Sequence, residues 1–205
     1  MPRIKHSQYA AAIVLCCTAC TMNDREIADE PKMAAIAPPP AVVDSILPME
    51  AMIARFQAAM PSQPAALENS ASSRAELMDM LAAALRDSSA AGLYALRLSA
   101  PEFAYLYFPS SHFAREPYRH PPQLAWLMIE QNSIKGETRL LRRFGGGDIR
   151  FTRHTCPHPP VREGVNRLWQ GCTVDMAAPV GTLRLFGTIM ERAGRFKFVS
   201  FANDL

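Results

Sequence analysis

The densest apolar segment of the chain is Leu185-Phe186-Gly187-Thr188-Ile189-Met190-Glu191-Arg192-Ala193-Gly194-Arg195-Phe196-Lys197-Phe198-Val199-Ser200-Phe201. Apolar and polar residues alternate along much of it, with the two-residue period of a β-strand. Ala193-Gly194 lies between two such runs, and a glycine-containing pair in that position is typical of a hairpin turn. We therefore expect two antiparallel strands, Thr182 to Arg192 and Arg195 to Phe201, buried against the rest of the domain.

Two earlier segments carry the same alternation and predict two further strands. They are Ile149 to Arg153 and Asn166 to Met176. In the last predicted strand, Phe196, Phe198 and Phe201 do not keep one parity, which predicts an irregularity or burial on both faces near the end.

Helix signals dominate the chain before residue 148. Ser73-Arg74-Ala75-Glu76 and Ser99-Ala100-Pro101-Glu102 both match the capping box, in which the serine oxygen accepts an amide proton and the glutamate reaches back to the cap. After Ser73, leucines recur every four residues and predict a buried stripe. After Ser99, apolar residues keep helical spacing until Pro109, where we expect the helix to stop.

A third helix is predicted from Pro121-Pro122 to Gly145-Gly146-Gly147. Its apolar face is traced by Leu124, Leu127, Met128, Gln131, Ile134 and Leu141. Helices first and antiparallel strands last predict an α+β class, with N-terminal helices packed on a C-terminal antiparallel sheet. The length of 205 residues fits one such domain, residues 49–205, plus extra segments.

The hairpin segment quoted above is similar to the last hairpin of SnoaL-like, nuclear-transport-factor-like domains. The stretch Asp87-Ser88-Ser89-Ala90-Ala91-Gly92-Leu93-Tyr94-Ala95-Leu96 resembles a helix link that those domains often carry. The resemblance implies a cone in which helices wrap against a curved sheet. Because this family includes enzymes and purely binding or structural domains, the resemblance implies no single activity.

The first residues have the organisation of a bacterial signal peptide. Arg3 and Lys5 precede an apolar run, Tyr9 to Cys17, which is too short to cross a bilayer. Cys17-Thr18-Ala19-Cys20 then resembles the lipobox of bacterial lipoproteins, although Cys17 stands where leucine is commonest. The resemblance implies cleavage after residue 19 and acylation of Cys20 with fatty acids such as palmitate.

Other readings of this segment stay open. Cys16 and Cys17 are rival acceptors, and an ordinary signal peptide cleaved near Ala19 or an uncleaved N-terminal helix would also fit the apolar run. Residues 20–48 are acidic and then proline-rich, which predicts a disordered tether. By the lipoprotein resemblance, Thr21 after the acylated cysteine implies the outer membrane, with the protein in the cell envelope and facing the periplasm.

Cys156 and Cys172 are the cysteines outside the signal region, and they flank a proline-rich connection between two predicted strands. In an oxidising envelope such a pair predicts a disulfide. Closing a loop of about 15 residues contributes roughly 3 kcal/mol on the chain-entropy account. The same cysteines with His154 and His158 could form a metal set, but their spacing matches no zinc pattern, and we expect no metal and no cofactor.

Several other features favour ordinary structural roles. The net charge of +3 comes without a run of adjacent basic residues, so we expect no nucleic-acid partner. His112 and His120 lie in a proline-rich segment where a solvated loop is expected. Five aromatic residues could line a pocket but are expected in the core. They are Tyr105, Tyr107, Phe108, Trp126 and Trp169.

The sequence therefore predicts a lipid-anchored envelope protein with a non-catalytic binding or structural domain. Its expected partners are the membrane, through the lipid, and an unidentified envelope protein or small apolar ligand. The alternative is a SnoaL-like pocket enzyme acting on a small apolar molecule, with His154 or Asp175 as the general base.

Overall fold

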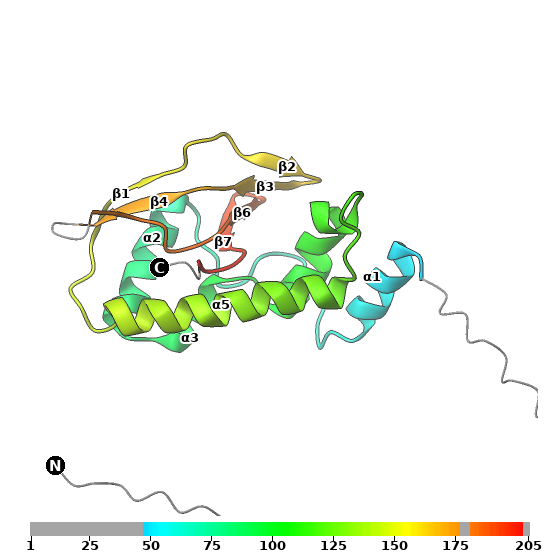
Figure 1. Ribbon diagram of the computed structural model, residues 1–205, viewed down its shortest axis with the longest axis horizontal. Helices are drawn as coiled ribbons and strands as arrows, with labels where there is room; N and C mark the ends of the chain where they lie inside the picture. Colours follow the sequence, from blue (N-terminus) through cyan, green and yellow to red (C-terminus); the bar gives the residue numbers. More distant parts are fainter. Residues whose placement is uncertain (1–46, 177–180, 203–205) are drawn as a thin grey trace, which may run out of the picture. The chain divides into compact units, whose positions relative to one another are not determined.

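The computed structural model describes residues 47–176 and 181–202, which belong to one unit, Ser45–Leu205. Its helices come first along the chain and its strands last (Figure 1). The helices are α1 (Met49–Ala58), α2 (Arg74–Arg86), α3 (Ala90–Leu96), α4 (Ala100–Glu102) and α5 (Pro122–Phe144). Three short turns lie between α4 and α5, namely the π-helix η1 (Phe103–Tyr107) and the 3-10 helices η2 (Phe108–Ser110) and η3 (His112–Ala114).

In the described part of the chain the strands form two antiparallel sheets. The first has the order β1-β4-β5, with β1 (Phe151–Thr155), β4 (Thr173–Met176) and β5 (Gly181–Leu183). The second has the order β2-β3-β6-β7, with β2 (Val161–Glu163), β3 (Asn166–Trp169), β6 (Ile189–Arg192) and β7 (Arg195–Phe198). The predicted α+β class is confirmed, whereas the finer SnoaL-like cone is not confirmed by this arrangement.

The expected hairpin is present, since β6 pairs with β7 around Ala193-Gly194, where both residues adopt positive φ. The two long predicted strands were wrong in extent. Asn166 to Met176 is divided into β3 and β4, and Thr182 to Arg192 into β5 and β6. In both cases the chain leaves one sheet and joins the other, and alternation alone does not reveal such a crossing because it continues on either side.

The two capping boxes differ. At α4 both halves form, because Ser99 accepts from the Glu102 amide and the Glu102 carboxylate accepts from the Ser99 amide. At α2 Ser73 accepts from the Glu76 amide as expected, but the Glu76 carboxylate bonds to the amide and hydroxyl of Ser72 instead. Pro109 also does not stop the helical turn, since it lies inside η2.

The core consists of two clusters of buried residues. One joins α2, α3 and the C-terminal end of α5 to the strands, and contains Phe186, Phe198 and Phe201. The other surrounds Phe103, whose ring lies 5.2 to 6.1 Å from those of Phe56, Tyr107, Phe108 and Trp126. The structure thus confirms that the predicted aromatic residues Tyr107 and Phe108 are core, and Tyr105, Trp126 and Trp169 pack partly buried against the clusters.

The long helix α5 has the predicted bounds, but it is rotated about its axis so that the predicted apolar face points away from the core. It runs along one side of the strands (Figure 1). Its buried residues are Pro122, Ala125, Ser133, Gly136, Leu140 and Phe144. The predicted apolar face is largely outside, with Leu124, Leu127, Met128 and Ile134 all 44% to 51% exposed.

Close backbone approach explains this orientation. A Cβ atom at Gly136 would meet Cβ of Phe201 at 2.8 Å and would fall still closer to the carbonyl oxygen of Ala202. Ser133 Oγ, one turn away, accepts from the Phe201 amide at 3.4 Å. The small side chains of Ser133 and Gly136 therefore mark the part of the inward face of α5 on which the C-terminal segment packs directly against the helix backbone.

Candidate functional site

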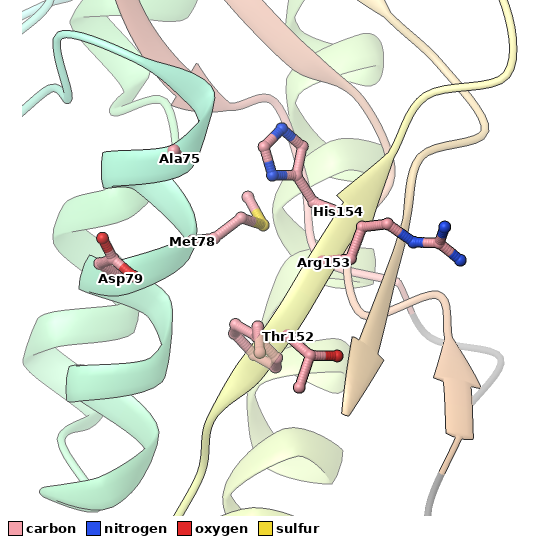
Figure 2. A pocket seen from close by; sticks show the side chains of 7 residues that line it. Ala75, Met78, Asp79, Thr152, Arg153 and His154 are labelled. Atoms are coloured by element: carbon pink, nitrogen blue, oxygen red, sulfur yellow. The ribbon is translucent and has the colours of Figure 1, made fainter. Parts of the chain in front are cut away.

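A small hollow lies between α2 and the first strand, β1 (Figure 2). Its volume is about 160 Å³. Its lining is formed by Ala75, Met78, Asp79, Phe151, Thr152, Arg153 and His154. Small-molecule sites usually enclose about 300–1,000 Å³ and are mostly apolar. This hollow is smaller and more polar, so it suits a few water molecules better than an apolar substrate.

The imidazole of His154 projects from β1 toward α2, beside Met78 (Figure 2). Burial lowers the pKa of His154 below its ordinary value, and the positive charge of Arg74 lowers it further. Arg74 is itself held over the ring of Trp169, with its Cζ atom 3.9 Å from the ring centroid. The structure therefore favours a neutral imidazole, as a general base requires.

Asp175, the other candidate base, lies on the opposite face of the same sheet. In the β1-β4 ladder Arg153 is opposite Asp175, and His154 is opposite the buried Val174. Because neighbouring side chains on a strand point to opposite faces, His154 and Asp175 point away from each other. Asp175 is bound instead by Arg153 Nε at 2.8 Å and Thr182 Oγ1 at 2.6 Å. The hydrogen bonds from Thr182 and Arg153 lower the pKa of Asp175. The carboxylate therefore stays ionised and paired with Arg153.

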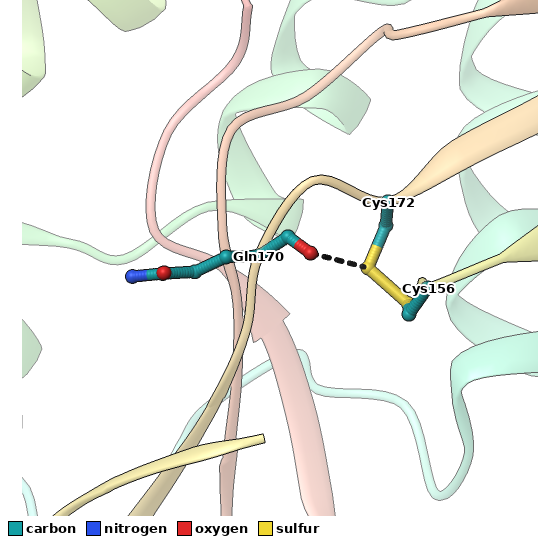
Figure 3. The surroundings of a disulfide bond; sticks show 3 residues. All are labelled: Cys156, Gln170 and Cys172. Carbon is teal, nitrogen blue, oxygen red and sulfur yellow. Dashed lines mark hydrogen bonds between the residues drawn. A yellow bond between two sulfur atoms is a disulfide. The ribbon is translucent and has the colours of Figure 1, made fainter. Parts of the chain in front are cut away.

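The predicted disulfide between Cys156 and Cys172 is present (Figure 3). It follows directly after the last pair of the β1-β4 ladder, Thr155 opposite Thr173. Cys172 is fully buried, with its sulfur 4.0 Å from the carbonyl oxygen of Gln170. The loop that the bond closes carries β2 and β3, which belong to the other sheet. The disulfide therefore fixes the point at which the chain passes between the sheets.

A second cluster joins the turns before α5 to β2 and was not found from the sequence. Glu163 Oε1 lies 2.8 Å from Nδ1 of His112 and accepts from the His112 amide at 3.2 Å. Its Oε2 atom is buried without a hydrogen-bond partner among the described residues. In the segment expected to be a solvated loop, the His112 side chain is 40% exposed and also contacts Glu163 of β2. The two residues are 51 positions apart, so no local pattern connects them.

The surroundings of the His112–Glu163 pair favour a structural role, attaching the η1–η3 segment to the second sheet, over a catalytic role. Ser110 and Ser111 directly precede His112, but their hydroxyls donate to the carbonyl oxygens of Tyr107 and Phe108. A nucleophile and its base require a hydrogen bond from the hydroxyl to the imidazole, and neither serine hydroxyl makes one. Asn166 beside them donates to the Leu106 carbonyl oxygen at 2.8 Å. These contacts attach the η1–η3 segment to the second sheet.

The remaining expectations concern metal, membrane and anchor. Among residues 47–176 and 181–202, no three histidine, cysteine or acidic side chains are grouped to hold a metal ion. His158 is exposed, and Cys156 and Cys172 are used in the disulfide. None of the helices in those ranges is long and apolar enough to span a membrane. The expected signal peptide, Cys20 and most of the expected tether lie outside the described residues.

Comparison with known proteins gives no relative for this chain, because no protein-family model, no curated protein and no solved structure matches it.

Proposed function

We propose that the chain is an exported bacterial lipoprotein, acylated on Cys20 and held at the outer membrane facing the periplasm. The observation that carries the proposal is the order of its first residues. A basic start and a short apolar run lead to Cys17-Thr18-Ala19-Cys20, and an acidic, proline-rich segment follows. That order matches secretion, cleavage before a cysteine and a spacer to the folded domain.

The disulfide supports export. Bonds of this kind persist in the bacterial periplasm and are rare in the cytosol, where thiols are kept reduced. Cys172 is buried and the Cys156–Cys172 bond joins two neighbouring strands, so it has a structural role.

The domain itself serves binding or structure, toward an envelope protein or a small apolar ligand, and is non-catalytic. The packing of its aromatic rings against one another supports this role, because those rings are used in the core. The separation of His154 from Asp175 also supports it, since the residue opposite His154 is the apolar Val174, and Asp175 is ion-paired with Arg153.

Metabolic labelling with a radioactive fatty acid tests the anchor. Wild-type protein should be labelled, and Cys20→Ala should lose the label. Cys17→Leu is the matched control, because it removes a rival thiol and restores the commonest residue at that position, so its label should remain. Undiminished labelling of Cys20→Ala, with loss in Cys16→Ala or Cys17→Leu, would move the acylated residue. Absence of label from the wild type would overturn the lipoprotein proposal.

A further inference from the structure

The outward face of α5 is divided along its length into an apolar half and a basic half. Leu124, Leu127, Met128 and Ile134 are exposed in the first half. Lys135, Arg139, Arg142 and Arg143 are exposed in the second. At 3.6 residues per turn, Lys135 and Arg142 continue the stripe that starts at Leu124. The two halves therefore form one surface, which we call the α5 face and define by these eight residues.

The α5 face contains no acidic side chain. The two glutamates of α5, Glu130 and Glu137, are half-buried, and Glu137 is bound by Nε of Arg97 at 2.7 Å. Among the ion pairs of the described residues, none involves Lys135, Arg139 or Arg142. The basic half thus carries positive charge for which residues 47–176 and 181–202 provide no ion-pair partner at Lys135, Arg139 or Arg142.

A second copy of the chain does not complement this face. If two α5 helices packed antiparallel, the apolar half of each would lie against the arginines of the other. If they packed parallel, the apolar halves would meet, but four cations would face four cations at the other end. An occupant has to offer apolar and anionic groups side by side.

We infer that the α5 face lies on the surface of a bilayer that contains anionic phospholipid. Amphipathic helices bind at such surfaces with their large apolar residues in the boundary between headgroups and acyl chains, and with Lys and Arg near the phosphates. Leu124, Leu127, Met128 and Ile134 supply the first contact, and Lys135, Arg139 and Arg142 supply the second.

This inference rests on the proposed lipid anchor and deepens it. Residues 21–46 separate Cys20 from the described domain, and a chain of that length reaches roughly 90 Å at about 3.5 Å per residue. Such a tether holds the domain near the membrane without fixing which side faces it. The α5 face gives the domain one orientation on the bilayer. Lipid anchoring combined with a basic patch also binds the membrane more strongly than either alone.

The test uses the full chain purified from the envelope and vesicles whose acyl chains carry bromine, which quenches tryptophan at the membrane boundary. Leu127→Trp places a reporter on the α5 face. Val165→Trp is the matched control, because Val165 is 70% exposed in the connection between β2 and β3. Wild type, which contains Trp126 and Trp169, gives the baseline in each case.

On vesicles of phosphatidylcholine with one third phosphatidylglycerol, the added fluorescence of Leu127→Trp should be quenched at least twofold more than that of Val165→Trp. Adding Lys135→Glu, Arg139→Glu and Arg142→Glu together should remove the difference. These positions are exposed, so circular dichroism and the melting temperature should stay unchanged and separate a lost contact from misfolding.

Equal quenching of the two reporters on vesicle-bound protein would overturn the α5 face while leaving the anchor intact. Sedimentation with vesicles of phosphatidylcholine alone examines the anchor, because acyl chains insert without anionic lipid. Failure there would refute the anchor, whereas quenching at position 127 on anionic vesicles would still report the face. A dimer that forms without vesicles and is abolished by Ile134→Glu would overturn the inference in favour of a second copy.

Discussion

Nζ of Lys197 donates hydrogen bonds to both carboxylate oxygens of Glu102, at 3.1 and 2.8 Å, where both side chains are almost fully buried. The same carboxylate accepts from the amides of Glu68 at 2.7 Å and Ser99 at 2.8 Å. One buried charge pair therefore connects the start of α4, the segment before α2 and the last strand, and its carboxylate accepts four hydrogen bonds from three donor groups. A fully paired buried charge is tolerated, whereas an unpaired one is costly.

Removing one member of this pair should destabilise the domain strongly. Glu102→Gln should lower the free energy of unfolding by about 3–5 kcal/mol, because Lys197 would be left charged and buried. Urea unfolding followed by circular dichroism measures the change. The double variant Glu102→Gln with Lys197→Met should recover part of the loss. As a control, Asp148→Asn removes the exposed Asp148–Arg150 pair and should change the free energy of unfolding by about 0–1 kcal/mol. Equal effects at the two sites would contradict the buried pairing.

The disulfide should stabilise both sheets at once. Cys156→Ser with Cys172→Ser should lower the free energy of unfolding by roughly 3 kcal/mol, because the unfolded chain without the cross-link has more conformational entropy. Denaturant unfolding of the oxidised protein and the variant gives this difference. Non-reducing peptide mapping of protein from the envelope should recover Cys156 and Cys172 in one linked fragment. Two free thiols in that material would refute a structural bond.

The terminal hairpin should be indispensable to the core. The ring of Phe198 is fully buried, 4.6 Å from that of Phe186 and 5.3 Å from that of Phe201. Phe198→Ala should cost about 3–5 kcal/mol, a large part of the 5–15 kcal/mol usual for a domain. The exported variant should therefore be degraded quickly, which a pulse-chase experiment measures. Val165→Ala, at an exposed position, should leave the half-life unchanged. If Phe198→Ala melted like the wild type, the hairpin would not be part of the core.

Gly136→Ala should destabilise the protein although alanine is the better helix former. In an open helix this substitution gains up to about 1 kcal/mol. Here the new methyl group would collide with the backbone of Ala202 and with Phe201, and overpacking typically costs about 1–3 kcal/mol. The melting temperature should fall, whereas Thr138→Ala on the exposed side of α5 should leave it nearly unchanged. A rise in the melting temperature of Gly136→Ala would show that the C-terminal segment does not pack on α5.

Mild acid should destabilise the folded state through His154. Burial and the charge of Arg74 lower the pKa of His154 in the folded protein below its ordinary value of 6.5. The unfolded chain then binds a proton more readily, so this contribution to stability is fully present above pH 6.5 and is lost as the pH falls through the folded pKa. Between about pH 7 and pH 5 the melting temperature of wild type should fall more than that of His154→Asn. Parallel curves for the two proteins would contradict the shift.

The sequence by itself determined the features whose physical causes lie within a few residues or in one short loop. The order of helices and strands follows from periodicity, the α4 cap from Ser99 and Glu102, and the β6-β7 turn from Ala193-Gly194. Cys156 and Cys172 could be paired because they flank one connection. These choices depend on local backbone preference and short loop closure, which neighbouring residues set.

The tertiary structure alone decided how those elements pack. The pattern of Leu124, Leu127 and Ile134 predicts a face for α5 but does not say whether that face is covered. The backbone of Ala202, 66 positions after Gly136, decides it by packing on the side of α5 where Gly136 has no side chain. In the same way His112 meets Glu163, and Lys197 meets Glu102, across separations that no local pattern spans. The physical reason is that packing and buried charge pairing depend on which distant segments meet, and that is fixed only when the whole chain has folded.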